Sequence, residues 1–191
     1  MERIERIVYQ TPEKPSTVEG KETTLWLTGP AEFLCAEVAK NLYAAEPWRQ
    51  LFGDYIDPYK RMDYPFRALP ALRIYNNDYS KQFESWFVEG DLTCDLIFPA
   101  SIRRKETEQL PDSITAALLQ QFRRPSFFDA LCDKVPGLNE LGKRFSVDKS
   151  LAFEFGEELV PLTQMTVNFR IDLRKWDEYL ESDNRTKDEP F

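Results

Sequence analysis

Two acidic clusters are the groups in this sequence whose types and spacing best fit catalysis. Asp54 and Asp57 lie three residues apart, and three glutamates crowd one turn, namely Glu154, Glu157 and Glu158. Paired carboxylates can hold magnesium or divide the roles of acid and base between them. Because one cluster adjoins a proline and the other flanks a glycine, solvated turns are the simpler interpretation. We therefore expect no catalytic residue, no metal site and no cofactor.

Other catalytic chemistry is restricted by composition. The chain has no histidine, which is the commonest general base near neutral pH and the commonest metal ligand. Neither glycine-rich phosphate-binding motif occurs. Cys35, Cys94 and Cys132 lack the close pairing of a zinc site, and three widely spaced cysteines indicate buried thiols in a reducing compartment. The protein is therefore expected not to be an enzyme.

Length and charge indicate one acidic domain. The 191 residues suffice for a single domain with a substantial core. The net charge of −8, from 25 basic and 33 acidic residues, opposes a general nucleic-acid coat but suits the wall of a channel that must not hold DNA. No apolar stretch approaches a membrane span, and the N-terminus lacks the apolar run of a signal peptide. We expect a protein kept in a cytosol or in something assembled there.

The hydrophobic periodicity predicts an α+β fold with a single antiparallel β-sheet and helices packed on one face. Three parts are expected: an N-terminal arm over 1–24, one domain over 25–181, and a flexible tail over 182–191. Gly90-Asp91 indicates a turn or bulge between two strands, and Ser126 with Asp129 resembles a helix capping box. The predicted elements are a helix over 30–46, a short helix from Trp48 to Ile56, strands over 69–75, 83–88 and 92–98, a helical segment over 101–145, strands over 151–155 and 163–173, and a helix from Trp176 onward.

The last predicted strand has the most regular pattern in the chain. Apolar residues occupy every second position from Met165 to Leu173, with polar residues between them. We also place Thr163 on the polar face. Such a face fits contact with a neighbouring copy or the lining of a channel, and it equally fits the solvent side of an ordinary half-buried sheet. The candidate subunit-interface or lumen residues are Thr166, Asn168, Arg170, Asp172 and Arg174.

A second candidate surface lies in the proline-broken connector over 47–66. Its aromatic residues stand among charged ones, and tyrosines in such a setting can anchor a partner or pack internally. The candidate partner-interface residues are Tyr55, Tyr59, Tyr64 and Phe66.

The run Leu69–Tyr75, the run Gly90–Pro99, the final strand 163–173 and the leading helix together resemble the tail-terminator and neck (head-tail joining) proteins of tailed bacteriophages, over roughly residues 28–180. The resemblance implies a virion structural protein, assembled in the host cytoplasm, that forms a homo-oligomeric ring, usually a hexamer. Such a ring joins the tail tube to the connector or portal-side neck proteins. DNA passes through it without sequence-specific binding. The segment 101–145 and the arm are additions that could dock a collar, sheath or connector.

Two other functions remain open at this point. A small cytosolic adaptor would bind one partner through the tyrosine-rich connector over 55–66. A carboxylate-dependent metalloenzyme would use Asp54 and Asp57, or the cluster around Glu154.

Overall fold

The structure, a computed structural model, describes residues 29–52, 56–57, 69–76, 86–100, 109–155 and 157–187. The helices are α3 (Pro30–Ala44), α4 (Glu46–Phe52), α5 (Leu110–Phe122), α6 (Pro125–Cys132) and α7 (Leu173–Lys187). The strands are β1 (Ile56–Asp57), β2 (Ala71–Asn76), β3 (Phe87–Ile97), β4 (Leu138–Phe155) and β5 (Glu158–Asp172). Within these ranges, none of the helices has the length and hydropathy of a membrane span.

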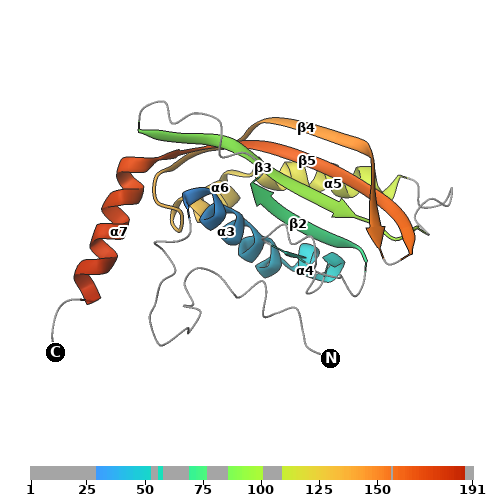
Figure 1. The fold of residues 1–191 in the computed structure, drawn as a ribbon, viewed down its shortest axis with the longest axis horizontal. Coiled ribbons are helices and arrows are strands. Elements are labelled where there is room, and N and C mark those ends of the chain that lie inside the picture. Colours follow the sequence, from blue (N-terminus) through green and yellow to red (C-terminus); the bar gives the residue numbers. More distant parts are fainter. Residues whose placement is uncertain are drawn as a thin grey trace.

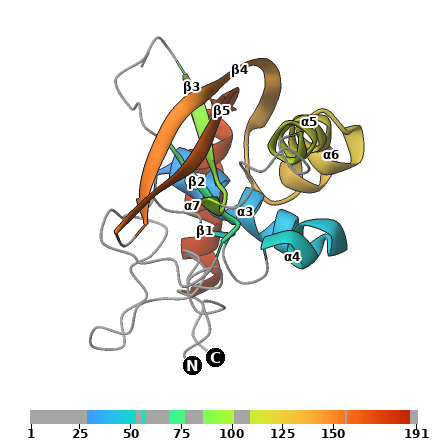
Figure 2. The same cartoon turned by 90° about the vertical axis from the view of Figure 1, so that its right-hand side faces the viewer.

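The strands form one sheet in the order β1-β2-β3-β5-β4. Helices α3 to α6 lie on one face of it, and α7 continues from the end of β5 at one end of the sheet (Figures 1 and 2). The predicted α+β fold, with an antiparallel sheet and helices on one face, is therefore confirmed. All described strand pairs are antiparallel except one, because the two-residue β1 pairs parallel with β2.

The core lies between the sheet and α3. Phe33, Leu34 and Leu42 of α3 are fully buried, and so are the alternating apolar residues of β5 from Met165 to Ile171. Phe33 also packs edge-to-face against Trp176 of α7, with ring centroids 5.3 Å apart. One apolar layer thus joins the first described helix, the central strand and the last helix.

The hairpin of β4 and β5 dominates the sheet, and β4 forms its outer edge (Figure 1). β4 ends at Phe155 and β5 begins at Glu158, so the two strands meet where the glutamate-rich turn is predicted; Gly156 lies outside the described residues. The pairing of β4 with β5 is interrupted by register shifts, two of them between Leu138 and Phe145. Gly142 lies in this irregular stretch with a φ of +71°, a conformation that favours glycine.

The predicted helical segment 101–145 is wrong at its C-terminal end, because β4 begins at Leu138. Leu138, Leu141 and Phe145 have helical spacing in sequence, yet they pair with Ile171, Phe169 and Val167, which are successive inward residues of β5. The extra residues of the bulges stretch the normal repeat of two. A bulged strand thereby imitates the periodicity of a helix.

Four smaller predictions also need correction. The strands expected over 83–88 and 92–98 are not separated at Gly90, because β3 runs from Phe87 to Ile97 and pairs with β5 along its whole length; residues 83–85 lie outside the described residues. α6 begins at Pro125, which suits a first helical position, so Ser126 is not its cap. α4 ends at Phe52, short of Ile56, which belongs to β1. α7 runs through Lys187, into the segment predicted to be a flexible tail.

Candidate functional site

The polar residues predicted on the last strand lie on the sheet face opposite the helices. Thr166, Asn168, Arg170 and Asp172 share that face by strand alternation. The placement of Thr163 there is wrong. It alternates in step with Met165 and is buried on the helix-covered face.

Asn168 supports the bulge of β4. Its side-chain oxygen accepts the backbone N–H of Arg144, and its amide nitrogen donates to the carboxylate of Glu140. Glu140 also accepts a hydrogen bond from Lys143 at 2.8 Å. Asn168 is buried by these contacts. Its side chain therefore replaces backbone hydrogen bonds that the bulge removes from the β4–β5 ladder.

Asp172 caps helix α7. It directly precedes the first helical residue, and its Oδ1 accepts the backbone N–H of Arg174 at 3.0 Å, as a helix N-cap does. The Arg174 guanidinium also binds both carboxylate oxygens, at 3.0 and 2.8 Å. This hydrogen bonding lowers the pKa of Asp172 and raises the pKa of Arg174. Arg174 thus joins the predicted set from α7 and not from the strand.

Thr166, Arg170 and Arg174 are the predicted residues that reach solvent. The Arg170 guanidinium stacks on the Phe87 ring at 3.9 Å, and its Nε lies 3.0 Å from a Glu89 oxygen without hydrogen-bond geometry. Thr166 lines a shallow depression of about 380 Å³ over Gly90. Arg170 and Arg174 are therefore each accompanied by a carboxylate.

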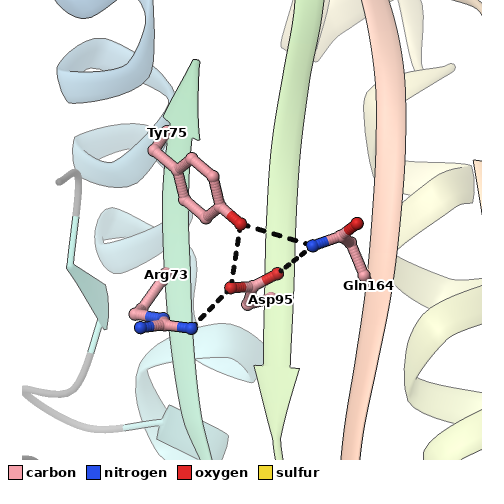
Figure 3. Close-up of polar contacts among 4 residues, drawn as sticks. All are labelled: Arg73, Tyr75, Asp95 and Gln164. Atoms are coloured by element: carbon pink, nitrogen blue, oxygen red, sulfur yellow. Dashed lines mark hydrogen bonds and ion pairs between the residues drawn. The ribbon is translucent and has the colours of Figure 1, made fainter. Parts of the chain in front are cut away.

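A buried polar cluster on the same face was not found from sequence (Figure 3). It joins β2, β3 and β5 through Asp95, whose Oδ2 accepts hydrogen bonds from Arg73 Nη2 at 2.6 Å and from the Tyr75 hydroxyl at 3.1 Å. Its Oδ1 accepts the Gln164 amide at 2.9 Å. Asp95 is 1% exposed and Arg73 is 6% exposed. The sequence signal was a charged residue between apolar neighbours in each strand, Leu-Arg-Ile in β2 and Cys-Asp-Leu in β3.

A small apolar cluster shields this ion pair. Ala71, Ile97, Val160 and Leu162 are buried together beside it. The Phe153 ring of β4 stacks on the Arg73 guanidinium at 4.7 Å. This pair is removed from solvent and from any substrate. Its hydrogen bonds link neighbouring strands, and removing one partner would leave an unpaired buried charge.

The remaining candidate groups are distributed as follows. Tyr55, Tyr59, Tyr64 and Phe66 lie outside the described residues, as does Asp54. Glu154 and Glu157 are exposed at the β4–β5 turn. Within the described ranges, no group of three acidic or cysteine side chains is placed to hold a metal ion.

The cysteines are free thiols. Burial raises the pKa of Cys35 and, in the same way, that of Cys94, which lies opposite it on the sheet side of the core. Cys132 is partly buried, donates to the Leu138 carbonyl at 3.4 Å and also has a raised pKa, chiefly from burial. All three thiols are therefore poor nucleophiles at neutral pH.

The contacts of Glu140 give a pH-dependent prediction. Its pKa is lowered, first by the hydrogen bond from Lys143 and also by that from Asn168. A carboxyl whose pKa is lower in the folded state stabilises the fold above its ordinary pKa of about 4.3, and this contribution is lost as the pH falls through the lower value. In urea titrations, the Glu140→Gln variant should lose less stability than the wild type between about pH 5 and pH 3.

Glu154→Gln, at an exposed position near the other end of β4, is the matched control. Identical acid dependence of the wild type and the Glu140→Gln variant would refute the assignment.

Comparison of the chain with protein-family models and with curated proteins found no match.

Proposed function

We propose that this chain is a non-catalytic structural subunit of a tailed phage, one that assembles into a tail-terminator or neck ring. The ring would join the tail tube to the connector at the head and leave a passage for DNA. The element order, from the leading helix through the antiparallel sheet to the long final strand, is consistent with the resemblance that first raised this function.

The observation that carries the assembly proposal is the surface of the β4–β5 hairpin. Phe145 and Val147 on the outer strand are 46% and 37% exposed, and Leu159 beside the turn is 65% exposed. Large exposed apolar side chains along one hairpin, next to a strand edge that pairs with none of the described strands, are typical of a surface that another protein covers.

The charges on the open sheet face support a passage that does not hold DNA. Arg170 lies beside Glu89, and Arg174 binds Asp172. Phosphate binding requires cations that can displace counterions. Since Arg170 and Arg174 already have anionic partners and the chain carries a net charge of −8, these two arginines would not hold the phosphate backbone.

Negative-stain microscopy of the full chain mixed with purified tail tubes tests the proposal. We expect rings with a central opening, seated at one end of the tubes. The Leu159→Ser variant should form fewer rings and cap fewer tubes, because it removes an exposed apolar contact without altering the core. A chain that remains monomeric and never binds tubes would overturn the proposed function.

A further inference from the structure

The outer edge of β4 carries a short regular stretch that is open to a partner. Residues 145–148 pair with β5 between two register shifts, and all residues from 143 to 150 are exposed. Among the described strands, none pairs with the other side of β4. Phe145 and Val147 project toward the helix side, where the Arg123 guanidinium of the α5–α6 junction stacks on Phe145 at 4.8 Å.

The backbone of this stretch presents hydrogen-bonding groups to the open edge. The N–H of Arg144 points inward, to the Asn168 side chain. Because backbone groups alternate in direction along a strand, the N–H and C=O of Phe145 and Val147 point outward. An edge of this kind binds an extended segment by adding a strand to the sheet.

We propose that this edge binds a second copy of the chain, with the two β4 strands antiparallel about a two-fold axis at Ser146. In this register Phe145 lies opposite Val147 of the second copy, and Arg144 lies opposite Asp148. Symmetry repeats each pair. Apolar side chains then cover one another on the helix side, and opposite charges meet on the other face.

The outward backbone groups agree with the same register. Phe145 and Val147 of opposite copies form the hydrogen-bonded pairs, and Ser146 faces itself in a pair without hydrogen bonds. A register centred on Val147 would instead place Phe145 opposite Lys149 and leave Arg144 opposite a serine. Charge and apolar complementarity therefore select the axis at Ser146.

The one unfavourable juxtaposition in this register is already neutralised within each copy. Lys143 would approach Lys149 of the second copy, at the margin of the paired stretch. Lys143 binds Glu140 at 2.8 Å, and Lys149 binds Asp112 of α5 at 2.6 Å. These ion pairs reduce the repulsion between the two lysines.

A two-fold contact of this kind differs from the contact that closes a ring. A ring requires two different surfaces of each subunit to meet, whereas β4 would meet its own copy. The paired state, which covers Phe145 and Val147, is therefore a dimer of the free protein or a join between two rings. Leu159 lies outside the paired stretch and stays exposed for the contact within a ring. The test of the pairing is separate from that of the proposed function.

Sedimentation equilibrium of the full chain tests the pairing through a charge swap. Arg144→Asp places like charges opposite each other at two symmetric positions, and the dimer should weaken roughly tenfold. The double variant Arg144→Asp/Asp148→Arg restores opposite charges and should recover most of the affinity. Leu159→Ser, which lies outside the paired stretch, should leave the dimer unchanged.

Cysteine crosslinking tests the register. Ser146→Cys places two thiols on the axis, where the Cα atoms of such a pair lie about 4.5 Å apart, within reach of a disulfide. It should form a covalent dimer under mild oxidation, while the wild type, Val147→Cys and Ser150→Cys should not. Dominant crosslinking of Val147→Cys would overturn the register.

A wild-type chain that is monomeric at all concentrations would overturn the pairing itself, as would an Arg144→Asp variant that dimerises normally. Because tube capping is scored independently, either result leaves the proposed ring function standing. If the chain forms the β4 dimer but never caps tubes, the proposed ring function is overturned and the pairing stands.

Discussion

Replacing Asp95 with alanine should lower the free energy of unfolding by about 3–5 kcal/mol, because removing one partner of a buried ion pair leaves the other charge uncompensated. Arg73 would keep its charge in a site where it is 6% exposed, and its Nε already lacks a hydrogen-bond partner. The Tyr75 hydroxyl and the Gln164 amide would each lose the hydrogen bond to Asp95, while the Gln164 amide keeps its bond to the Tyr75 hydroxyl at 3.3 Å. Urea denaturation followed by circular dichroism measures the loss.

The matched control replaces both charges. In the double variant Arg73→Met/Asp95→Leu, no buried charge is left unpaired, and apolar side chains extend the small cluster around Ala71 and Ile97. Its stability should return to within about 1–2 kcal/mol of the wild type. An Asp95→Ala variant as stable as the wild type would show that the pair does not join the strands as described.

Gly137→Ala should be the other strongly destabilising substitution, by at least about 2–4 kcal/mol. Gly137 has a φ of +82°, and a Cβ there would lie 2.3 Å from the Asp172 carbonyl oxygen. The Gly137 carbonyl also accepts the Asp172 N–H at 2.9 Å. The start of β4 therefore cannot approach the cap of α7 this closely once a methyl group is present. Thermal unfolding monitored by circular dichroism checks the prediction.

Gly142→Ala separates backbone strain from the steric clash. Gly142 also has a positive φ, of +71°, but the nearest atom to its hypothetical Cβ is the Phe122 Cβ at 3.4 Å. Only the conformational cost, about 1–2 kcal/mol, should appear. Equal losses for the Gly137 and Gly142 variants would contradict the proposed role of the close approach to Asp172.

The parts of the fold that follow from local periodicity could be predicted from the sequence. The alternation from Met165 to Ile171 identified the central strand β5, and the four-residue spacing from Leu34 to Leu42 identified α3. β4 was missed in part because its bulges give Leu138, Leu141 and Phe145 the spacing of a helix. A bulge depends on pairing with a distant strand, which a local pattern does not record.

The sequence pattern predicts which residues share the polar face of the sheet, but it does not predict which side chains on that face contact each other. Asn168 was a candidate subunit-interface or lumen residue, and within the single chain its side chain supports the β4 bulge. Asp172 directly before an amphipathic helix was a recognisable N-cap signal. The Arg73–Asp95 pair required the register of β2 on β3, which joins residues 22 positions apart. From the sequence, Arg73 and Asp95 could be recognised only as two separate charges between apolar neighbours, and not as a pair.

The polar contacts of the single chain stabilise its interior, whereas the β4–β5 hairpin exposes apolar side chains. The ion pair at Asp95, the cap at Asp172 and the amide of Asn168 fasten the chain to itself. Phe145 and Val147 on β4 and Leu159 beside its turn are left to solvent in the single chain. The proposal that the chain self-assembles rests on these exposed side chains.

Native mass spectrometry of the full chain, alone and with tail tubes, tests that proposal most directly. We expect species at multiples of 22.4 kDa, namely a dimer in the free protein and a larger closed ring in the presence of tubes. A single species at 22.4 kDa under every condition would contradict it.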